Sequence, residues 1–344
     1  MSNRIVLRGC LDGYTSYGLH LLHVIKGFIK LGYDVNTLGT PFGTHKEPLP
    51  AWAAETVVHK PQVERCEMVI HCPLFGPSER RDVIYNTMWE TTRLHNQSFL
   101  NLQNSAVVIV PSMWQAELFS AQGIKRPIFV APMGIDSNVF KYQPKQPGEV
   151  FTFGAAGRVD GAGDRKRIDR VIKAFKDEFK PDEDVRLVLK TYPDNGLGKL
   201  IGGDKRISLK ESFSTRAKLR DWYSDIDCFV TATHGEGWGL MSHETMAMGI
   251  LNIAPLFGGH TAFMTRDNVL PVDYKLAPAG GEYKGLGLWA DVCRDHLMAR
   301  MREAYNGGSH LEKLRMTAAS DAARLDWDNG CKALERIMIE VGAI

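Results

Sequence analysis

Short apolar runs alternate with amphipathic stretches along the first part of the chain. Residues 4–9 form a β-branched run, and the apolar positions of residues 19–31 fall largely on one side of a predicted helix. Gly32 stands where a helix is expected to end, and residues 34–38 predict the next strand. Strands that alternate with helices predict parallel βαβ units.

The same alternation continues on both sides of one break in the pattern. Four more apolar runs predict strands before the break, at residues 68–71, 83–85, 106–110 and 127–131. Residues 141–148 then contain two prolines and a glycine without apolar periodicity, which indicates a linker. Beyond it, a second set of strands is predicted at residues 151–156, 185–191, 228–231 and 251–254.

We therefore predict an α/β chain with two sequential, doubly wound, Rossmann-like domains. The first is expected to span residues 1–145 and the second residues 146–320. Residues 321–344 are expected to form a C-terminal helix that packs back toward the first domain, with an apolar stripe that includes Leu334 and Ile337.

Composition excludes several classes of protein. Of the 344 residues, 44% are hydrophobic and 24% are charged, which is typical of soluble globular proteins. No uncharged apolar run approaches the roughly 20 residues that a bilayer span needs. The run Ile5–Leu7 is also too short for the core of a signal peptide. We expect a cytoplasmic protein without stable membrane insertion, or one that binds peripherally to a membrane surface.

Charge and cysteine content narrow the choice further. The 42 Lys and Arg residues nearly balance the 40 Asp and Glu residues, and the net charge of +2 argues against a dedicated nucleic-acid binder. The six cysteines include no Cys-x-x-Cys pair, so their spacing fits neither a zinc ribbon nor a thioredoxin-like site. Free thiols are expected, as in a reducing compartment.

The strongest local signal is the stretch from His234 to Gly249, which follows a predicted strand, contains three loop glycines and then becomes helical. Backbone N–H groups at a helix N-terminus that a ligand reaches through glycines form an anion site. Glu236 lies in the loop and Glu244 about one turn into the helix, so carboxylates that accept hydrogen bonds from hydroxyls flank this site. The alternative is a structural turn with a solvated Glu244.

A second signal follows the strand predicted at residues 151–156. Gly157 and Arg158 come directly after it, and residues 165–167 are all basic. Arg158 and Lys166 could converge on a diphosphate, the first as a fork and the second as a point charge. A solvated basic loop is the alternative. Both signals stand at the carboxyl ends of strands, where open α/β sheets place their ligands.

Together these segments resemble the retaining glycosyltransferases of family 4, which have the GT-B fold of two Rossmann-like domains facing a central cleft. The stretch His234–Gly249 resembles the Glu-x7-Glu signature of that family, and Gly154–Phe175 resembles its Gly-Arg…Lys segment and following helix. Residues 132–140 look like the Pro-x-Gly-Val-Asp crossing between domains. Residues 86–91 and 110–114 are also similar to segments of many members.

The resemblance implies a nucleotide-sugar donor that is held mainly by the second domain. Arg158 and Lys166 would bind its diphosphate, and Leu240 and Met241 would offer backbone N–H groups to phosphate. From the first domain, which would lie on the acceptor side, the loop that ends at Gly18 would close over the phosphates.

The resemblance also implies roles around the sugar and the ribose. Glu236 would meet the sugar hydroxyls, His71 would approach the transferred sugar, and Glu244 would hold the ribose. The backbone would assist Glu236 at three positions: Gly237, Trp238 and Gly239.

Some residues depart from the family pattern. Arg167 stands where many members have glycine, and residues 160–164 lengthen the loop before Lys166. The segment Gly258–Thr261 lacks the acidic residue often found after its two glycines, which leaves the role of this loop open.

Other residues that could suggest chemistry have a structural interpretation. Asp225 and Asp227 match the Asp-x-Asp pattern of metal-dependent glycosyltransferases, but they run directly into an apolar strand. His20 and His23 lie on a helix face without a third ligand at metal-binding spacing. The aromatic residues that could stack on an acceptor, or simply pack in the protein, are Tyr17, Trp89 and Trp114.

The expected reaction is transfer of a sugar from a UDP- or GDP-type donor to an acceptor hydroxyl, with retention and without a metal or other cofactor. The cations and the helix N-terminus would stabilise the leaving diphosphate. The expected acceptor is a glycan or a glycolipid precursor, such as a lipid-linked sugar, and a hydroxymethylated DNA base is the alternative. From another class, a nucleotide-sugar epimerase or a non-catalytic sugar-nucleotide binder stays open.

Overall fold

The computed structural model describes most of the chain. The described residues are 3–11, 15–40, 49–58, 67–70, 83–144, 148–157, 165–191, 196–210 and 215–344. They form two compact units. Unit 1 contains residues 1–89, 93–134 and 325–344, and unit 2 contains residues 90–92 and 135–324. Along this part of the chain, unit 2 begins at residue 135, eleven residues before the second domain was expected to begin, at residue 146.

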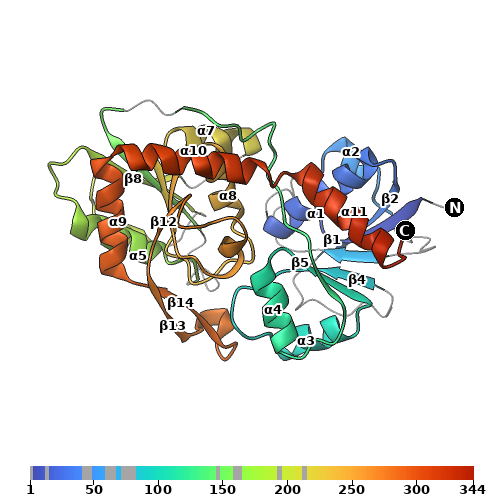
Figure 1. The fold of residues 1–344 in the computed structure, drawn as a ribbon. Helices are drawn as coiled ribbons and strands as arrows, with labels where there is room; N and C mark the ends of the chain where they lie inside the picture. Colours follow the sequence, from blue (N-terminus) through green and yellow to red (C-terminus); the bar gives the residue numbers. More distant parts are fainter. Residues whose placement is uncertain are drawn as a thin grey trace. The chain divides into compact units, whose positions relative to one another are not determined.

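Unit 1 is built on a six-stranded parallel sheet with the order β2-β1-β3-β4-β5-β6 (Figure 1). Its strands are β1 (Arg4–Cys10), β2 (Asp34–Thr40), β3 (Glu67–Ile70), β4 (Val83–Asn86), β5 (Val107–Val110) and β6 (Ile128–Val130). Its helices are α1 (Ser16–Lys30), α2 (Ala51–Ala54), α3 (Asn96–Gln103), α4 (Met113–Ala121) and α11 (Trp327–Glu340).

Helix α1 shows how local sequence defines an element of unit 1. The Thr15 hydroxyl caps its first turn by accepting from the Gly18 N–H at 3.0 Å, and Gly32 follows its end with φ = +91°. Its apolar stripe is buried in a core that also takes in residues from α11. In Figure 1, α11 lies beside α1, and the Cys331 thiol and the His23 carbonyl are 3.7 Å apart.

Unit 2 contains a second six-stranded parallel sheet, with the order β12-β11-β10-β7-β8-β9. Its strands are β7 (Phe151–Ala156), β8 (Val185–Lys190), β9 (Ile207–Lys210), β10 (Cys228–Val230), β11 (Leu251–Ala254) and β12 (Leu270–Pro271). An antiparallel pair, β13 (Tyr274–Pro278) and β14 (Leu288–Val292), is added to this unit.

The helices of unit 2 cover its sheet and carry the candidate site. They are α5 (Ile168–Glu178), α6 (Gly198–Ile201), α7 (Arg216–Ser224), α8 (Leu240–Ala247), α9 (Arg294–Asn306) and α10 (Ser309–Ala323), with 3-10 turns at Gly258–Ala262 and Gly281–Tyr283. The apolar residues of α5 join those of the central strands in one buried core. None of the helices in the described ranges is both long enough and apolar enough to span a membrane.

Candidate functional site

The glycine-rich segment between β10 and α8 forms the centre of the candidate site. It leaves the sheet after Val230, passes Glu236 and enters α8 at Gly239. Gly239 has φ = +98°, which glycine adopts without strain. Since glycine has no side chain, the first-turn N–H groups of α8 have no side-chain cap. Uncapped N–H groups at a helix N-terminus attract anions.

Two basic residues that precede α5 hold Glu236. The Nζ atom of Lys166 lies 2.6 Å from Oε1 and 2.7 Å from Oε2 of Glu236, and Nη1 of Arg165 lies 3.4 Å from Oε2. Burial acts to raise the pKa of Glu236, but Lys166 and Arg165 outweigh it and hold this pKa well below its usual range. Glu236 is therefore an ionised carboxylate at a buried position.

A second carboxylate joins this cluster from a distant part of the sequence. Glu90 belongs to unit 2, although the chain on both sides of residues 90–92 belongs to unit 1. Thr92 fixes this segment, because its N–H donates to the Leu288 carbonyl at 2.9 Å and its hydroxyl accepts from the Leu288 N–H at 2.7 Å. Burial raises the pKa of Glu90, and the charge of Arg165 opposes this shift. Two carboxylates thus face two cations.

Glu244 lies on α8 and is only 1% exposed. Two side chains of α7 bind it: the Tyr223 hydroxyl donates to Oε2 at 2.8 Å, and Arg216 donates to Oε1. The Arg216 guanidinium also lies over the Phe140 ring, 4.6 Å from its centroid. A carboxylate has about four lone-pair directions, so these two contacts leave capacity for hydroxyl groups of a ligand.

Several buried polar atoms near these carboxylates have no hydrogen-bond partner in the described part of the chain. They are Arg165 Nε, Arg216 Nε and His260 Nε2. Buried polar atoms in folded proteins are nearly always satisfied, so each orphaned atom needs an explanation. A polar ligand in this region would supply one.

The structure brings some predicted site residues together and gives others a different place. Lys166 and Glu236 form the ion pair described above, whereas the Trp238 side chain is buried and donates from Nε1 to His243 Nδ1 at 3.2 Å. Leu240 and Met241 form the first turn of α8, and Gly237 precedes it.

Three other predicted site residues are not part of this cluster in the described structure. Gly18 lies within the first turn of α1 in unit 1, so the expected loop ends before it, at the capping residue Thr15. The predicted Arg158 and His71 both lie outside the described residues.

The sequence did not point to Arg165, Glu90, Tyr223, Arg216 or His260 as site residues. Arg165 and His260 had a signal, since one belongs to the basic run before α5 and the other to the glycine loop after β11. The other three are placed by contacts between segments that are distant in sequence.

Arg167, next to Lys166, has an unusual backbone. Its φ of +49° is the one positive value among the described non-glycine residues, and glycine adopts this conformation more readily than arginine. Its guanidinium binds both oxygens of Asp169, at 2.9 and 3.0 Å, and its Nη1 lies 3.2 Å from His234 Nε2. The His234 ring stacks on Trp289, with the ring centroids 4.1 Å apart.

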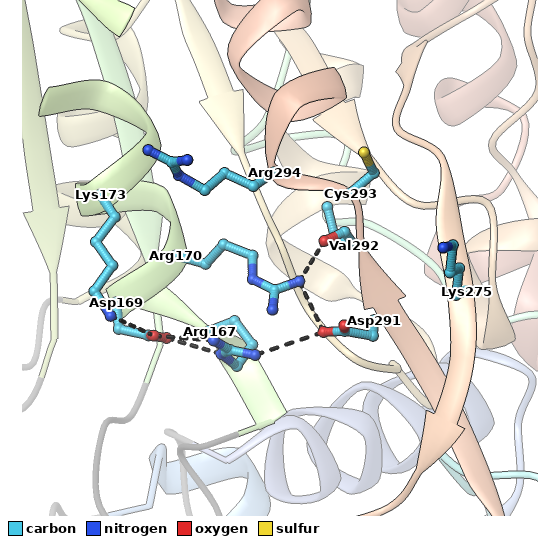
Figure 2. A pocket seen from close by; sticks show the side chains of 9 residues that line it. All are labelled: Arg167, Asp169, Arg170, Lys173, Lys275, Asp291, Val292, Cys293 and Arg294. Carbon is cyan, nitrogen blue, oxygen red and sulfur yellow. Dashed lines mark hydrogen bonds and ion pairs between the residues drawn. The ribbon is translucent and has the colours of Figure 1, made fainter. Parts of the chain in front are cut away.

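Arg167 borders on a hollow of about 460 Å³ in unit 2. Figure 2 shows the side chains that line this hollow. Arg167 lies between Asp169 and Asp291. Asp291 also pairs with Arg170, whose Nη1 lies 2.7 Å from its Oδ1. The basic residues of this lining are Arg167, Arg170, Lys173, Lys275 and Arg294. The ion pairs fix the guanidinium groups beside the start of α5.

Two residues that have a structural interpretation from the sequence, Asp227 and Trp89, make hydrogen bonds within the protein. Asp227 accepts from the Thr152 N–H at 2.7 Å and so joins β10 to β7. Trp89 is buried and donates from Nε1 to the Arg93 carbonyl at 2.9 Å, so it packs in the protein. Within the described ranges, no group of three or more His, Cys, Asp or Glu side chains is arranged to hold a metal ion. Three described cysteines are free thiols: Cys228, Cys293 and Cys331.

Part of unit 2 matches a known protein family. Residues 150–275, which contain the Lys166–Glu236 pair and α8, match the family model described as "Glycosyl transferases group 1". No curated protein sequence matches the chain significantly.

Solved structures resemble the chain over nearly its full length. Sucrose-phosphate synthase from Thermosynechococcus elongatus is 14% identical, with a TM-score of 0.71 and 99% of both chains covered. The lipopolysaccharide outer core galactosyltransferase WaaB is 11% identical, with a TM-score of 0.66 over 98% of this chain and 99% of that one. These likenesses show the fold: the chain has the GT-B architecture of two parallel six-stranded sheets with helices, as the sequence predicted.

One further structure has a bound nucleotide in its description. The pneumococcal O-GlcNAc transferase GtfA in complex with UDP and GlcNAc is 17% identical, with a TM-score of 0.59. The match covers 81% of this chain and 57% of that chain.

Proposed function

We propose that this chain is a glycosyltransferase that moves a sugar from a nucleoside-diphosphate sugar to an acceptor hydroxyl, with retention of anomeric configuration and without a divalent metal. The observation that carries the proposal is the Lys166–Glu236 pair beside the uncapped N-terminus of α8. Both lie in the segment that matches the group 1 glycosyltransferase family model.

The diphosphate of the donor would bind at the start of α8. The N–H groups of Leu240 and Met241 carry the positive end of the helix dipole. Lys166 adds a positive charge, because it binds Glu236 in the loop that enters α8 and its side chain is 28% exposed. These charges would stabilise the negative charge that develops on the leaving diphosphate. In a site of this kind, fixed cations take the part that a divalent metal plays elsewhere. Arg158 would add a forked contact, as the family resemblance implies.

Glu236 would orient the transferred sugar. Because its pKa is held low, it is ionised and accepts hydrogen bonds from hydroxyl groups. Both of its oxygens already contact Lys166, which makes it a poor nucleophile. We therefore favour substitution on one face of the sugar. The bond from the anomeric carbon to the phosphate oxygen breaks, the acceptor oxygen bonds to that carbon, and the leaving phosphate oxygen takes the acceptor proton. His71 would approach the sugar from the first domain.

The nucleotide would have a ribose, held by Glu244, and we propose a UDP- or GDP-sugar as donor. One GT-B structure that the chain resembles contains UDP and GlcNAc, and another is a galactosyltransferase of the lipopolysaccharide outer core. On this basis we propose a glycan or glycolipid precursor as the acceptor.

The test is a thermal-shift panel of UDP-, GDP- and ADP-sugars, followed by hydrolysis and transfer assays with the best donor. We expect one nucleotide series to stabilise the protein and release free nucleoside diphosphate in the presence of EDTA. NMR of the product should show the anomeric configuration of the donor. Conversion of the sugar without an acceptor would indicate an epimerase, and binding without release of diphosphate would indicate a non-catalytic binder. Absence of binding to every donor would contradict the proposal.

A further inference from the structure

We propose that His260 is a sugar-binding residue of this site, and that its Nε2 atom accepts a hydrogen bond from one hydroxyl group of the transferred sugar. The inference rests on the proposed function, and it adds a residue that recognises part of the donor. It also gives a role to the glycine loop after β11, which the sequence left open.

The hydrogen bond at the other ring nitrogen determines the tautomer of His260. Nδ1 lies 3.1 Å from the carbonyl oxygen of Pro255. A carbonyl can only accept, so Nδ1 carries the hydrogen. Burial lowers the pKa of His260, although the charge of Glu236 opposes the shift, so the ring is neutral near pH 7. Nε2 is therefore a bare lone pair that needs a donor.

This lone pair has no donor within the described protein. His260 is 1% exposed, and Nε2 is buried without a hydrogen-bond partner. Such an atom is rare in a folded protein, because water has been removed and nothing has replaced it. His260 and Glu236 form no ion pair with each other, while Glu236 is bound by Lys166. A ligand O–H would satisfy the imidazole.

The ring of His260 lies against the glycine turn of the candidate site. A Cβ atom built at Gly239 would lie 2.6 Å from both Cδ2 and Nε2 of His260, and 3.7 Å from Cγ of Glu236. The Nε2 edge of the ring therefore lies against the turn that enters α8, beside the carboxylate proposed to meet the sugar. Only glycine at position 239 lets the imidazole come so close.

The two neighbouring acceptors define what they can recognise. Glu236 is a charged acceptor and His260 Nε2 is a neutral one, and neither can donate at neutral pH. Together they suit a sugar that offers separate hydroxyl hydrogens to each. Loss of one hydroxyl from the donor would leave Nε2 unsatisfied again, and this gives the site a means of selecting the sugar.

The test is a set of deoxy donors combined with two variants. The best nucleotide sugar and its 2-, 3-, 4- and 6-deoxy analogues are compared on wild-type protein, His260→Leu and His260→Gln, with hydrolysis rates and dissociation constants measured for each pair. With wild-type protein, we expect one deoxy analogue to have a kcat/KM about tenfold lower than that of the full donor, because it lacks the hydroxyl group that donates to Nε2. In His260→Leu that loss should vanish, while the penalties at the other positions stay. In His260→Gln, whose amide oxygen can accept, the wild-type pattern should be kept.

Controls separate this inference from the proposed function and from general damage. His310→Gln, at a side chain that is 57% exposed, should leave every value unchanged. If wild-type protein binds and hydrolyses no donor, the proposed function fails and this inference fails with it. If wild-type protein is active but His260→Leu keeps all its deoxy penalties, or loses them at every position alike, only the inference is overturned. Should His260→Leu not fold, a changed hydroxyl preference in His260→Gln overturns it as well.

Discussion

Tyr223 donates its hydroxyl hydrogen to Glu244, with 2.8 Å between Oη and Oε2. This bond joins the end of α7 to α8, and Arg216 from the start of α7 binds the other carboxylate oxygen. Burial raises the pKa of Tyr223 well above its usual value, and Glu244 adds to the shift, so the phenol stays protonated and can donate. Glu244 is thus part of a buried hydrogen-bond network.

Removing this bond should cost stability. We expect Tyr223→Phe to lower the free energy of unfolding by about 1.5–3 kcal/mol, because a hydrogen bond to a charged acceptor is lost in a buried place. Urea denaturation measures it. Tyr142→Phe, at a residue that is 43% exposed, is the control and should change stability by less than about 0.5 kcal/mol. Equal effects for the two variants would show that the Tyr223 bond adds nothing.

The two glutamates should fail in different ways. We expect Glu236→Gln to lower kcat about 100-fold while the dissociation constant of the donor changes less than threefold, because its charge acts mainly on the sugar. Glu244→Gln should instead raise the dissociation constant about tenfold, since its contact is to the ribose. Single-turnover kinetics measure the rate of transfer, and calorimetry measures the dissociation constant of the donor. Normal transfer by both variants would place the site elsewhere.

Much of the fold could be predicted from the order of apolar runs. The strands expected at residues 68–71, 127–131 and 151–156 appear within one residue of their predicted bounds, as β3, β6 and β7. The pair β13 and β14 was missed, because its residues are mostly exposed or half-buried and its partner strands are separated by a glycine-rich loop. Such a pair depends on hydrogen bonds between strands more than on a local pattern.

The candidate site was predictable only where its signals were local. The glycine turn and its two glutamates lie within one short segment, so Glu236 and Glu244 could be proposed as site residues from the sequence. The electrostatic interaction of Glu90 with Arg165 and the hydrogen bond of Tyr223 with Glu244 join residues that are 75 and 21 positions apart. No spacing rule reports such contacts, because the fold alone brings these side chains together.

The buried histidine of unit 1 should make stability depend on pH. His20 is 4% exposed and stacks on Trp327, and burial lowers its pKa to about 4 from an ordinary 6.5. The unfolded chain therefore binds more protons between these values, and stability is full above pH 6.5 and falls as the pH drops toward 4. Between pH 7.5 and pH 5, His20 should account for a loss of about 2 kcal/mol.

The measurement compares urea denaturation of wild-type protein and His20→Leu at both pH values. From pH 7.5 to pH 5, the free energy of unfolding of wild-type protein should fall by about 2 kcal/mol more than that of His20→Leu. Tyr142→Phe, at an exposed position, should keep the wild-type slope. A slope in His20→Leu that equals that of wild-type protein would contradict the assignment of a buried neutral imidazole.

The backbone of Arg167 gives a test that separates strain from contacts. Its φ of +49° costs a non-glycine residue about 1–2 kcal/mol, and its guanidinium regains stability from Asp169 and His234. Arg167→Ala loses the contacts and keeps the strain, whereas Arg167→Gly loses the same contacts and relieves it. We expect the glycine variant to be about 1 kcal/mol more stable than the alanine variant by chemical denaturation. At Lys173, an exposed position within α5, the order should reverse, because glycine is about 1 kcal/mol worse than alanine inside a helix. The same order at both positions would mean that position 167 is unstrained in solution.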